Sequence, residues 1–383
     1  MSDDPFTRTM GLLLGPPLAE GNDARALVNG DEIFPAMLSA IGSAQRTITF
    51  ETYVYWSGDI GRRFGEALAE RAAAGVQVLV MLDWFGSGAL NERAIERMRQ
   101  AGVQVRRYNP PRWTTLGRLN NRTHRKLLVV DGRVGFTGGV GIADKWRGDA
   151  QDSAHWRDTH FRVEGPAVAQ IQAAFLDNWL QVTGELHHGP GYFPVIEPAG
   201  GQRAHLFTSS AGGGAESAQL MYLVSIASAR ESIALSMAYF VPDDVAVESL
   251  VAARRRGVQV RLIVPGPHID FGVVRRASRT TWGPLLAAGV EIHEYQPTMF
   301  HCKVLVVDAL WTSVGSTNFD SRSFSVNDEA NLNVYDAGFA RAQLDLFERD
   351  LAQARRITLQ AWQARPWTDK LLDWAAGLLS SQL

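Results

Sequence analysis

The chain has 383 residues, 46% of them hydrophobic and 20% charged, and its formal net charge is −2. This is the composition of a globular protein with a sizeable buried core, and the length favours two domains or one duplicated domain. The slight acidic excess excludes an overall positive field of the kind that attracts nucleic acid, so no nucleic acid partner is expected.

The ends and the cysteine content indicate where such a chain would reside. Residues Met1 to Pro5 lack the basic and apolar regions of a signal peptide. No apolar run reaches the roughly 18 residues that span a bilayer. Cys302 is the single cysteine, which is consistent with a reducing compartment, and we expect it to be a small buried hydrophobic residue. These features predict a cytoplasmic protein, either soluble or peripheral on a membrane.

The most informative feature is an internal repeat. Four segments of the first half recur in the same order, 177 to 187 residues further on. The pairs are 40–48 with 225–233, 75–78 with 257–260, 101–105 with 288–292, and 124–126 with 301–303. Near-constant offsets indicate a duplication of roughly half the chain, and the drift between them indicates loop insertions.

Each repeat predicts the same elements in chain order. An apolar stretch (47–56, then 232–241) indicates a buried strand, and a helix (60–74, then 245–256) follows it up to a glycine. A β-branched run (76–82, then 258–264) adds a second strand, so each half should contain a right-handed βαβ unit in a mostly parallel sheet. The predicted fold class is α/β: two duplicated α/β/α sandwich halves, with their sheets packed together about a pseudo-twofold axis.

We place the halves at residues 1–190 and 200–360. The Gly-, Pro- and His-rich segment 184–201 lies between them, and the second half opens with a short strand at 204–208. Residues 361–383 form a C-terminal amphipathic helix whose apolar stripe includes Trp367, Leu371, Trp374 and Leu378. Because basic residues are few there, we expect this stripe to dock on the protein's own core rather than on a membrane.

Two copies of one polar motif stand at matched places in the repeat. The pattern is His-x-Lys-x4-Asp, and its members are His124, Lys126 and Asp131 in the first half and His301, Lys303 and Asp308 in the second. The apolar, β-branched residues after each lysine predict strands, on which residues two apart share a face. An imidazole beside a cation suits a phosphate group better than a core. For the two aspartates, a local backbone-binding role at the strand end and a direct catalytic role both stay open.

Further candidates follow each motif. Ser316 and Asn318 offer donors to a bound phosphate, and Gly138 and Gly139 let the backbone approach it. The carboxylates of Asp158 and Glu329 could accept the Nδ1 proton of a catalytic histidine. Before the second motif, Arg275, Arg276 and Arg279 are candidates for headgroup contacts, although a solvated surface explains them equally well.

The paired motifs resemble the phospholipase D superfamily. The flanking segments 121–132, 138–144, 277–279, 285–290 and 294–297 are similar to bacterial cardiolipin synthase, and the resemblance covers roughly residues 27–351. Gly139 and Gly141 depart from it, because the superfamily often has Ser and Asn there. The paired N-terminal transmembrane helices of one cardiolipin synthase type are missing, which favours the shorter, membrane-peripheral type.

The resemblance implies two phospholipase D-like halves and phosphatidyl transfer in two steps. One histidine attacks phosphorus and forms a phosphohistidine, and the other protonates the leaving alcohol. The resemblance suggests His124 as nucleophile and His301 as acid, both lining one polar cleft. It also implies anionic phospholipids such as phosphatidylglycerol as substrates, a place on the inner face of the cell membrane, and no cofactor. No metal-ligand spacing appears, so no metal is expected.

Two alternatives remain open on the sequence. The same site chemistry with water as acceptor would give phospholipase D or another phosphodiesterase, including a nuclease, although the acidic net charge argues against a nuclease. A non-catalytic lipid-binding scaffold would keep the fold without the activity. Two complete motifs argue against that scaffold.

Overall fold

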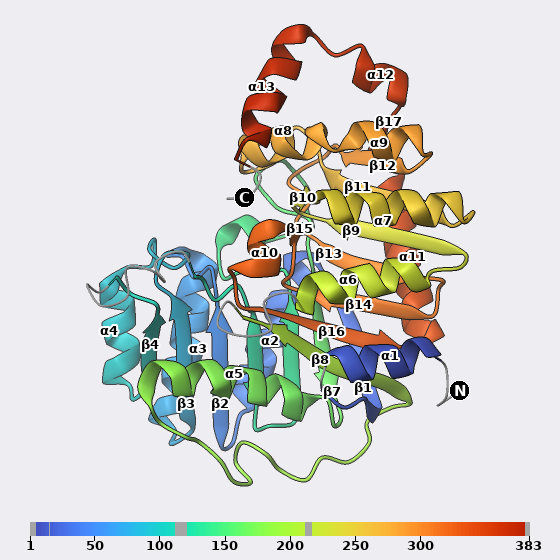
Figure 1. The fold of residues 1–383 in the computed structure, drawn as a ribbon. Helices are drawn as coiled ribbons and strands as arrows, with labels where there is room; N and C mark the ends of the chain where they lie inside the picture. Colours follow the sequence, from blue (N-terminus) through green and yellow to red (C-terminus); the bar gives the residue numbers. More distant parts are fainter. Residues whose placement is uncertain (1–4, 15, 112–120, 211–216, 380–383) are drawn as a thin grey trace.

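The computed structural model describes residues 5–14, 16–111, 121–210 and 217–379. Through this part of the chain runs one sheet of 15 strands, with the order β17-β12-β11-β9-β13-β14-β16-β8-β1-β7-β6-β5-β2-β3-β4 (Figure 1). The order is nearly symmetric about the β8–β1 pair, as a duplication requires.

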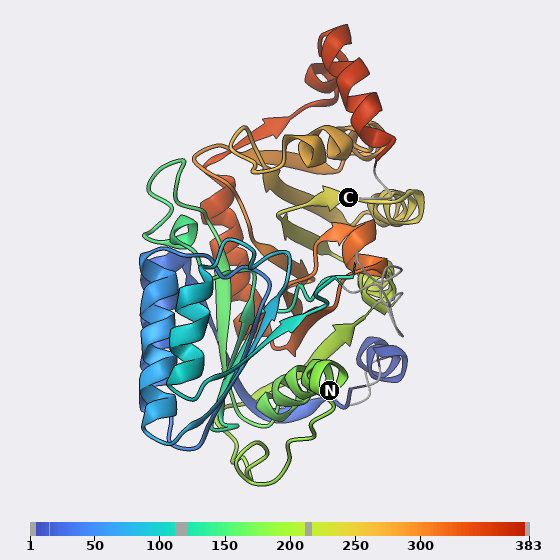
Figure 2. The same cartoon turned by 90° about the vertical axis from the view of Figure 1, so that its left-hand side faces the viewer.

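The first half contributes seven strands to this sheet, three of them parallel neighbours (β2, β3 and β4) and the rest antiparallel. The strands are β1 (Ala19–Val28), β2 (Thr47–Thr52), β3 (Gln77–Asp83), β4 (Gln104–Tyr108), β5 (Leu127–Val130), β6 (Val134–Gly138) and β7 (Thr159–Glu164). Its helices are α1 (Pro5–Leu14), which packs on α6 (Ser217–Ser228) of the second half, and α2 (Asn29–Ser43), α3 (Asp59–Ala73), α4 (Glu92–Gln100) and α5 (Val168–Thr183). Figure 2 shows α2, α3 and α4 on one side of these strands and α5 on the other.

The second half repeats this plan, with β9, β11 and β12 as the parallel strands. Its strands are β8 (Gln202–Ser209), β9 (Ser232–Met237), β11 (Gln259–Pro265), β12 (Glu291–Tyr295), β13 (Lys303–Val307), β14 (Trp311–Gly315), β16 (Glu329–Tyr335) and β17 (Ala354–Ile357). Its longer helices are α6 (Ser217–Ser228), α7 (Asp244–Arg255), α8 (Gly272–Thr280), α9 (Trp282–Ala287) and α11 (Ala337–Leu351). A small parallel pair, β10 (Phe240–Val241) with β15 (Phe319–Asp320), lies apart from the main sheet.

The duplicated α/β architecture that the repeats predict is confirmed. The prediction of a mostly parallel sheet is wrong, because the pairs of β2, β3 and β4 and of β9, β11 and β12 are parallel and the other pairs of the main sheet are antiparallel. The two sheets also join edge to edge instead of packing as separate layers. Antiparallel pairing of β1 with β8 makes the junction, where the Gln202 side chain accepts from the Ala24 N–H at 2.6 Å. One hydrophobic core, which includes side chains of α5 and α11, extends across both halves. Two further cores pack the opposite face, one in each half. The halves are therefore one folding body, because exposing either edge strand would also open the shared core.

The two motif aspartates lie at the far ends of β5 and β13 from their histidines, and both hold the backbone. The Asp131 carboxylate accepts N–H groups of residues 45, 46 and 47 at 2.7–2.9 Å. The Asp308 carboxylate does the same for residues 230, 231 and 232 at 2.8–2.9 Å. Both residues adopt positive φ, 52° and 53°. Each carboxylate thus ties the end of a motif strand to the start of its neighbour, β2 or β9.

The C-terminal segment departs from its prediction. It forms α12 (Leu359–Gln363) and α13 (Trp367–Gly377), and residues 380–383 lie outside the described residues. The predicted stripe does not dock on the core: Trp367 is 74% exposed and Trp374 61%. Instead α13 packs on α8 through its polar and small side, with Asp373 and Ala376 buried. Ion pairs of Asp373 with Arg276 and Arg365 fix that orientation.

None of the described helices is long and apolar enough to cross a bilayer.

We predict that Asp131→Ala destabilises the fold while leaving the chemical step largely intact. Each variant of this kind removes an acceptor for three backbone N–H groups, which should lower the free energy of unfolding by about 2 kcal/mol. Urea denaturation followed by circular dichroism measures this, with Asp308→Ala as the equivalent in the other half. Asp345→Ala, on the exposed side of α11, is the control. Loss of activity in folded Asp131→Ala protein would instead support a direct catalytic role.

Candidate active site

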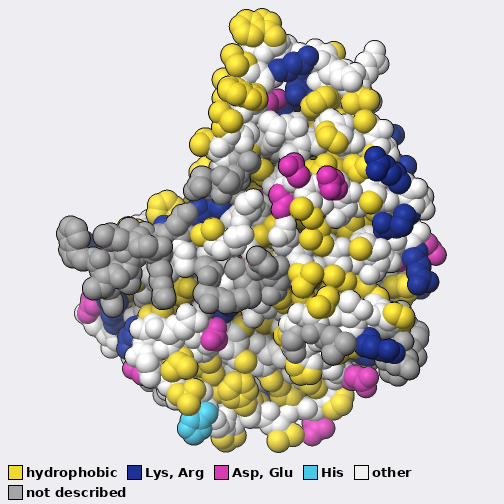
Figure 3. Space-filling model, viewed as in Figure 1, with side chains coloured by type: hydrophobic (Ala, Val, Ile, Leu, Met, Phe, Trp, Pro, Cys, Tyr) yellow, Lys and Arg dark blue, Asp and Glu magenta, His cyan; other side chains and the backbone are white. Residues whose placement is uncertain are grey.

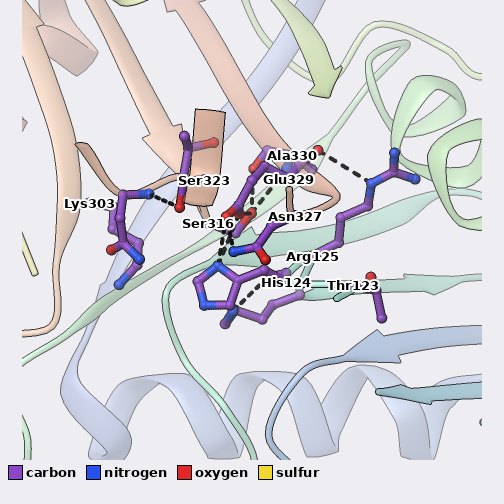
Figure 4. A network of polar contacts seen from close by, with 12 residues as sticks. Thr123, His124, Arg125, Lys303, Ser316, Ser323, Asn327, Glu329 and Ala330 are labelled. Carbon is purple, nitrogen blue, oxygen red and sulfur yellow. Dashed lines mark hydrogen bonds and ion pairs between the residues drawn. The ribbon is translucent and has the colours of Figure 1, made fainter. Parts of the chain in front are cut away.

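His124 stands in the extended segment that leads into β5, and its partner comes from the other half of the molecule. Its Nδ1 lies 3.0 Å from both carboxylate oxygens of Glu329, the first residue of β16 (Figure 4). The Ser316 hydroxyl donates to the same carboxylate at 2.5 Å. With Nδ1–H donated to Glu329, the tautomer is set so that Nε2 carries the free lone pair.

His301 precedes β13, and its imidazole is held by a carboxylate from the first half, as His124 is held by one from the second. Its Nδ1 lies 2.7 Å from Oδ2 of Asp158, which immediately precedes β7 in the first half. The Trp146 indole N–H donates to that same oxygen at 3.0 Å, and the backbone N–H of Thr159 donates to Oδ1 at 2.8 Å. Each half therefore supplies one histidine and the carboxylate that orients the other half's histidine.

Backbone hydrogen bonds hold each histidine segment beside the carboxylate segment of the other half. The His124 N–H donates to the Asp328 carbonyl at 2.8 Å, and the His301 N–H donates to the Arg157 carbonyl at 2.7 Å. In both cases the acceptor immediately precedes the carboxylate residue. Isolated parallel bridges, Thr123 with Asp328 and Arg157 with Phe300, flank the two points. The two motifs consequently meet at the junction between the halves.

The two lysines are buried beside their histidines. The Lys126 ammonium donates to the His124 carbonyl at 2.6 Å, and the Lys303 ammonium donates to the His301 carbonyl at 2.8 Å. Burial lowers the pKa of Lys126 to about 7, with Glu329 opposing the shift and Lys303 adding to it. Burial likewise lowers the pKa of Lys303. Lys303 from the second half lowers the pKa of Lys126 in the first, and Glu329 raises the pKa of both lysines, which places the two motifs near one another.

The pKa shifts around the site favour neutral histidines and ionised carboxylates. Burial lowers the pKa of His124 to about 4 although Glu329 opposes it, and burial and Lys303 lower the pKa of His301. Burial alone would raise the pKa of Glu329, but His124 and Lys126 hold it below its ordinary value. Each imidazole is thus prepared as a base or nucleophile at neutral pH.

Aromatic rings surround the histidines. The Tyr53 ring lies 5.1 Å from the His124 ring, centroid to centroid, and Lys126 stands over the same tyrosine. Rings around His301 are those of Trp146 and Trp156, both at 5.4 Å, and of Tyr239 at 6.4 Å. His124 and His301 are only 8% and 7% exposed. Aromatic side chains and the opposite half cover most of each ring, so the histidines of the predicted polar cleft have little contact with solvent.

Three of the four predicted phosphate-binding residues have internal roles. The Ser316 hydroxyl is engaged by Glu329 and by the Ala330 N–H. A Cβ at position 139 would lie 2.4 Å from the Asp158 carboxylate, and one at 138 would lie 2.6 Å from His160, so both glycines make room for neighbouring side chains. For Asn318, whose buried Oδ1 has no hydrogen-bond partner among the described residues, donation of its amide N–H to a phosphate stays a prediction.

Other predicted residues lie away from the histidines or are already paired. Each motif aspartate lies seven positions beyond its histidine along an extended segment, roughly 23 Å at about 3.3 Å per residue, which leaves Asp131 and Asp308 their structural role. Arg275 and Arg279 share Glu294, and Arg276 pairs with Asp373. Cys302 is buried, as predicted. Within the described ranges, no three His, Cys, Asp or Glu side chains gather as metal ligands, and the absence of a metal role stays a prediction.

Sequence reasoning missed a shell of buried acids behind His124. Glu51 accepts hydrogen bonds from Thr123 and from Asn178, and burial raises its pKa to about 7. Asp83 accepts the Thr123 N–H at 3.1 Å, and Asp328 accepts the Tyr108 hydroxyl at 2.6 Å. The available signal was Glu51 itself, the one charged residue among the threonines and apolar residues of β2. This shell anchors Thr123, and with it the residue that precedes His124.

Comparison with known proteins gives one consistent result. The family described as "Cardiolipin synthase, PLD-like domain" matches residues 37–178 and 222–351. The chain is 35% identical over 370 residues to a cardiolipin synthase of Geobacillus thermodenitrificans, covering 96% of this chain and 74% of that protein. It is 33% identical over 367 residues to the major cardiolipin synthase of Bacillus subtilis, covering 94% and 75%.

Solved structures support the fold alone. A phosphatidylserine synthase from Haemophilus influenzae superposes with a TM-score of 0.75 at 12% identity, covering 99% of this chain and all of that one. A polyphosphate kinase from Porphyromonas gingivalis has a TM-score of 0.59 at 14% identity, covering 93% of this chain and 53% of that one. The family match and the curated relatives together show that the chain belongs to the cardiolipin synthase family of the phospholipase D superfamily and is an enzyme of the phosphatidyltransferase class.

Proposed function

We propose that this enzyme transfers a phosphatidyl group between anionic phospholipids such as phosphatidylglycerol and so makes cardiolipin-type lipids. The observation that carries the proposal is the pair of buried histidines, each oriented by a carboxylate from the opposite half. Two imidazoles held through Nδ1 at one junction, with the Lys303 ammonium 3.4 Å from the His301 Nε2, suit a reaction that needs a nucleophile and an acid on opposite sides of one phosphorus.

In the first step, Nε2 of one histidine attacks phosphorus and the bond from phosphorus to the leaving alcohol breaks. The alcohol oxygen takes a proton from Nε2 of the other histidine, and a phosphatidyl-histidine remains. In the second step, the hydroxyl of the acceptor gives its proton back to that second histidine and attacks phosphorus, and the P–N bond breaks. We assign His124 as nucleophile and His301 as acid, following the family resemblance.

The charges around the histidines support this chemistry. Lys126 lies beside His124 and Lys303 beside His301, and a phosphodiester anion between them would be stabilised by their ammonium groups. The anion would also raise the lysine pKa values that burial lowers. The side-chain amide N–H of Asn318 is a further candidate donor to the phosphate. None of these steps calls for a cofactor.

Hydrolysis is the second candidate function, since water could replace the acceptor hydroxyl without any change in the site. The family membership favours transfer, and the aromatic cover of both rings supports it because it restricts access of water to the intermediate. We further propose that the enzyme works on the inner face of the cell membrane, as a peripheral protein.

Lipid analysis tests the proposal directly. Cells that lack their own cardiolipin synthase should accumulate cardiolipin-type lipids when this chain is expressed, as measured by mass spectrometry of total lipids. Purified enzyme with phosphatidylglycerol vesicles should release glycerol together with the new lipid. Release of phosphatidic acid without any dimeric phospholipid would favour hydrolysis.

We predict that His124→Asn and His301→Asn each lower turnover of phospholipid about a thousandfold or more. Asparagine is preferred to alanine because its amide still donates to the buried carboxylate of Glu329 or Asp158, which alanine would leave unpaired at a cost of about 1–3 kcal/mol. Initial rates and thermal unfolding are measured on the same preparations. Near-normal rates in either folded variant would remove that histidine from the mechanism.

A substrate with a different leaving group can show which histidine is the acid and which is the nucleophile. A nitrophenyl phosphodiester expels a nitrophenolate, which needs no protonation, so variants of the acid should recover most of their first-step rate with it. We expect rescue in His301→Asn and, more weakly, in Asp158→Asn. His124→Asn and Glu329→Gln should gain nothing. The burst of nitrophenol measures the rate of the first step. If His124→Asn and Glu329→Gln recovered their rates instead, the roles of the two histidines would be reversed.

We also predict an unusual pH dependence. Because the folded protein lowers the pKa of His124 to about 4, its neutral, nucleophilic form persists well below pH 6.5, where an ordinary histidine is half protonated. In His301→Asn with the nitrophenyl substrate, kcat/KM for the burst should stay level down to about pH 5 and fall only near pH 4. A midpoint at pH 6.5 or above would show that burial does not set the state of His124.

A further inference from the structure

The outward side of α13 is apolar although nothing in the described part of the chain covers it. Its side chains share one stripe of the helix because they are spaced three or four residues apart. We call this stripe the α13 face; its members are Trp367 (74% exposed), Leu371 (53%), Trp374 (61%) and Leu378 (65%). Figure 3 shows hydrophobic side chains along the arm at the top of the molecule, where α13 lies in Figure 1.

The acidic and basic side chains of α13 lie on different sides of the helix. Both acids point toward the protein, where Asp369 and Asp373 pair with Arg276 of α8. The helix's one base, Lys370, is exposed beside the α13 face. An apolar stripe with a cation at its edge and its acids turned away is complementary to an anionic lipid surface. The tryptophans strengthen this reading, since indole rings favour the boundary between water and hydrocarbon.

The α13 face is also connected to the active site. Ala376, on the buried side of α13, packs in one small cluster with Val274 and Ala277 of α8, and Tyr239 packs against that cluster. The Tyr239 ring lies 6.4 Å from the His301 ring. Near the start of α8, Phe271 is 60% exposed and its ring lies 6.4 Å from that of Tyr239. A surface that contacts α13 and Phe271 is therefore separated from His301 by little more than Tyr239.

We propose that the α13 face lies in the interface of an anionic phospholipid bilayer and places the paired histidines beside the lipid headgroups. With 11 residues, α13 is about 16 Å long, too short to span a bilayer but suited to lie in its surface. The inference rests on the proposed function for the identity of the lipids. It does not need that function to be correct for the binding itself.

Vesicle binding by the whole chain tests the surface. We expect Leu371→Ser with Leu378→Ser to weaken binding to vesicles of phosphatidylglycerol and phosphatidylethanolamine about tenfold or more. The matched control is Leu186→Ser with Leu310→Ser, two leucines that are 68% and 56% exposed elsewhere, and it should bind like the unmodified protein. Lys370→Glu should weaken binding to these vesicles much more than to phosphatidylcholine vesicles. Equal binding by the two leucine pairs would overturn the proposal.

A second measurement separates this inference from the proposed function. The ratio of activity on vesicles to activity on a short-chain, monomeric phosphatidylglycerol should fall about tenfold in the α13 variant and stay constant in the control. If no lipid is turned over but the vesicle-binding pattern holds, the proposed function fails and the surface stands. If the unmodified protein is a dimer that the α13 variant dissociates, and vesicle binding is unaffected, the face binds a second copy and the membrane proposal is wrong.

Discussion

The structure depends on the exchange of carboxylates between its two halves. Glu329 orients His124 and Asp158 orients His301, so neither half can assemble an active site alone. All four groups are buried, and a buried carboxylate without its partner would be costly. Breaking the junction would therefore expose the β1 and β8 edges, open the shared core and leave two charged groups unpaired. Catalytic geometry and the cohesion of the halves have the same physical origin.

The two halves are not identical around their orienting carboxylates, and in each half the neighbouring residue fits the size of its carboxylate side chain. In the second half the longer Glu329 is combined with Ser316, whose hydroxyl donates to it. At the equivalent place in the first half, the shorter Asp158 is combined with Gly139, where any side chain would collide with the carboxylate, and Trp146 supplies the donor instead. The two histidines thus have different surroundings within a nearly symmetric frame. Such a difference is what a reaction needs if one imidazole attacks and the other donates a proton.

Much of this architecture follows from local sequence, and the rest does not. Strand and helix patterns and the repeated motif predict both halves, because burial on a strand and capping by glycine are local properties. The exchange of partners could not be predicted, because Asp158 and Glu329 lie 143 and 205 residues from the histidines that they orient. The outward side of α13 was predicted wrongly, since two ion pairs of Asp373 outweigh the tendency of tryptophan and leucine to be buried. The acid shell behind His124 also arises from tertiary contacts.

A consequence for catalysis follows from the number of protons in the site. Burial keeps both imidazoles neutral, yet the proposed mechanism needs one of them protonated. The substrate can supply the reason, because a phosphodiester brings one negative charge beside two lysines and two histidines and raises the proton affinity of each. His301, whose Nδ1 is already donated to Asp158 at 2.7 Å, would form a well-stabilised imidazolium. In this mechanism His301 becomes protonated, and so able to act as the acid, only when the substrate binds. Before that, both histidines are neutral and His124 is available as the nucleophile.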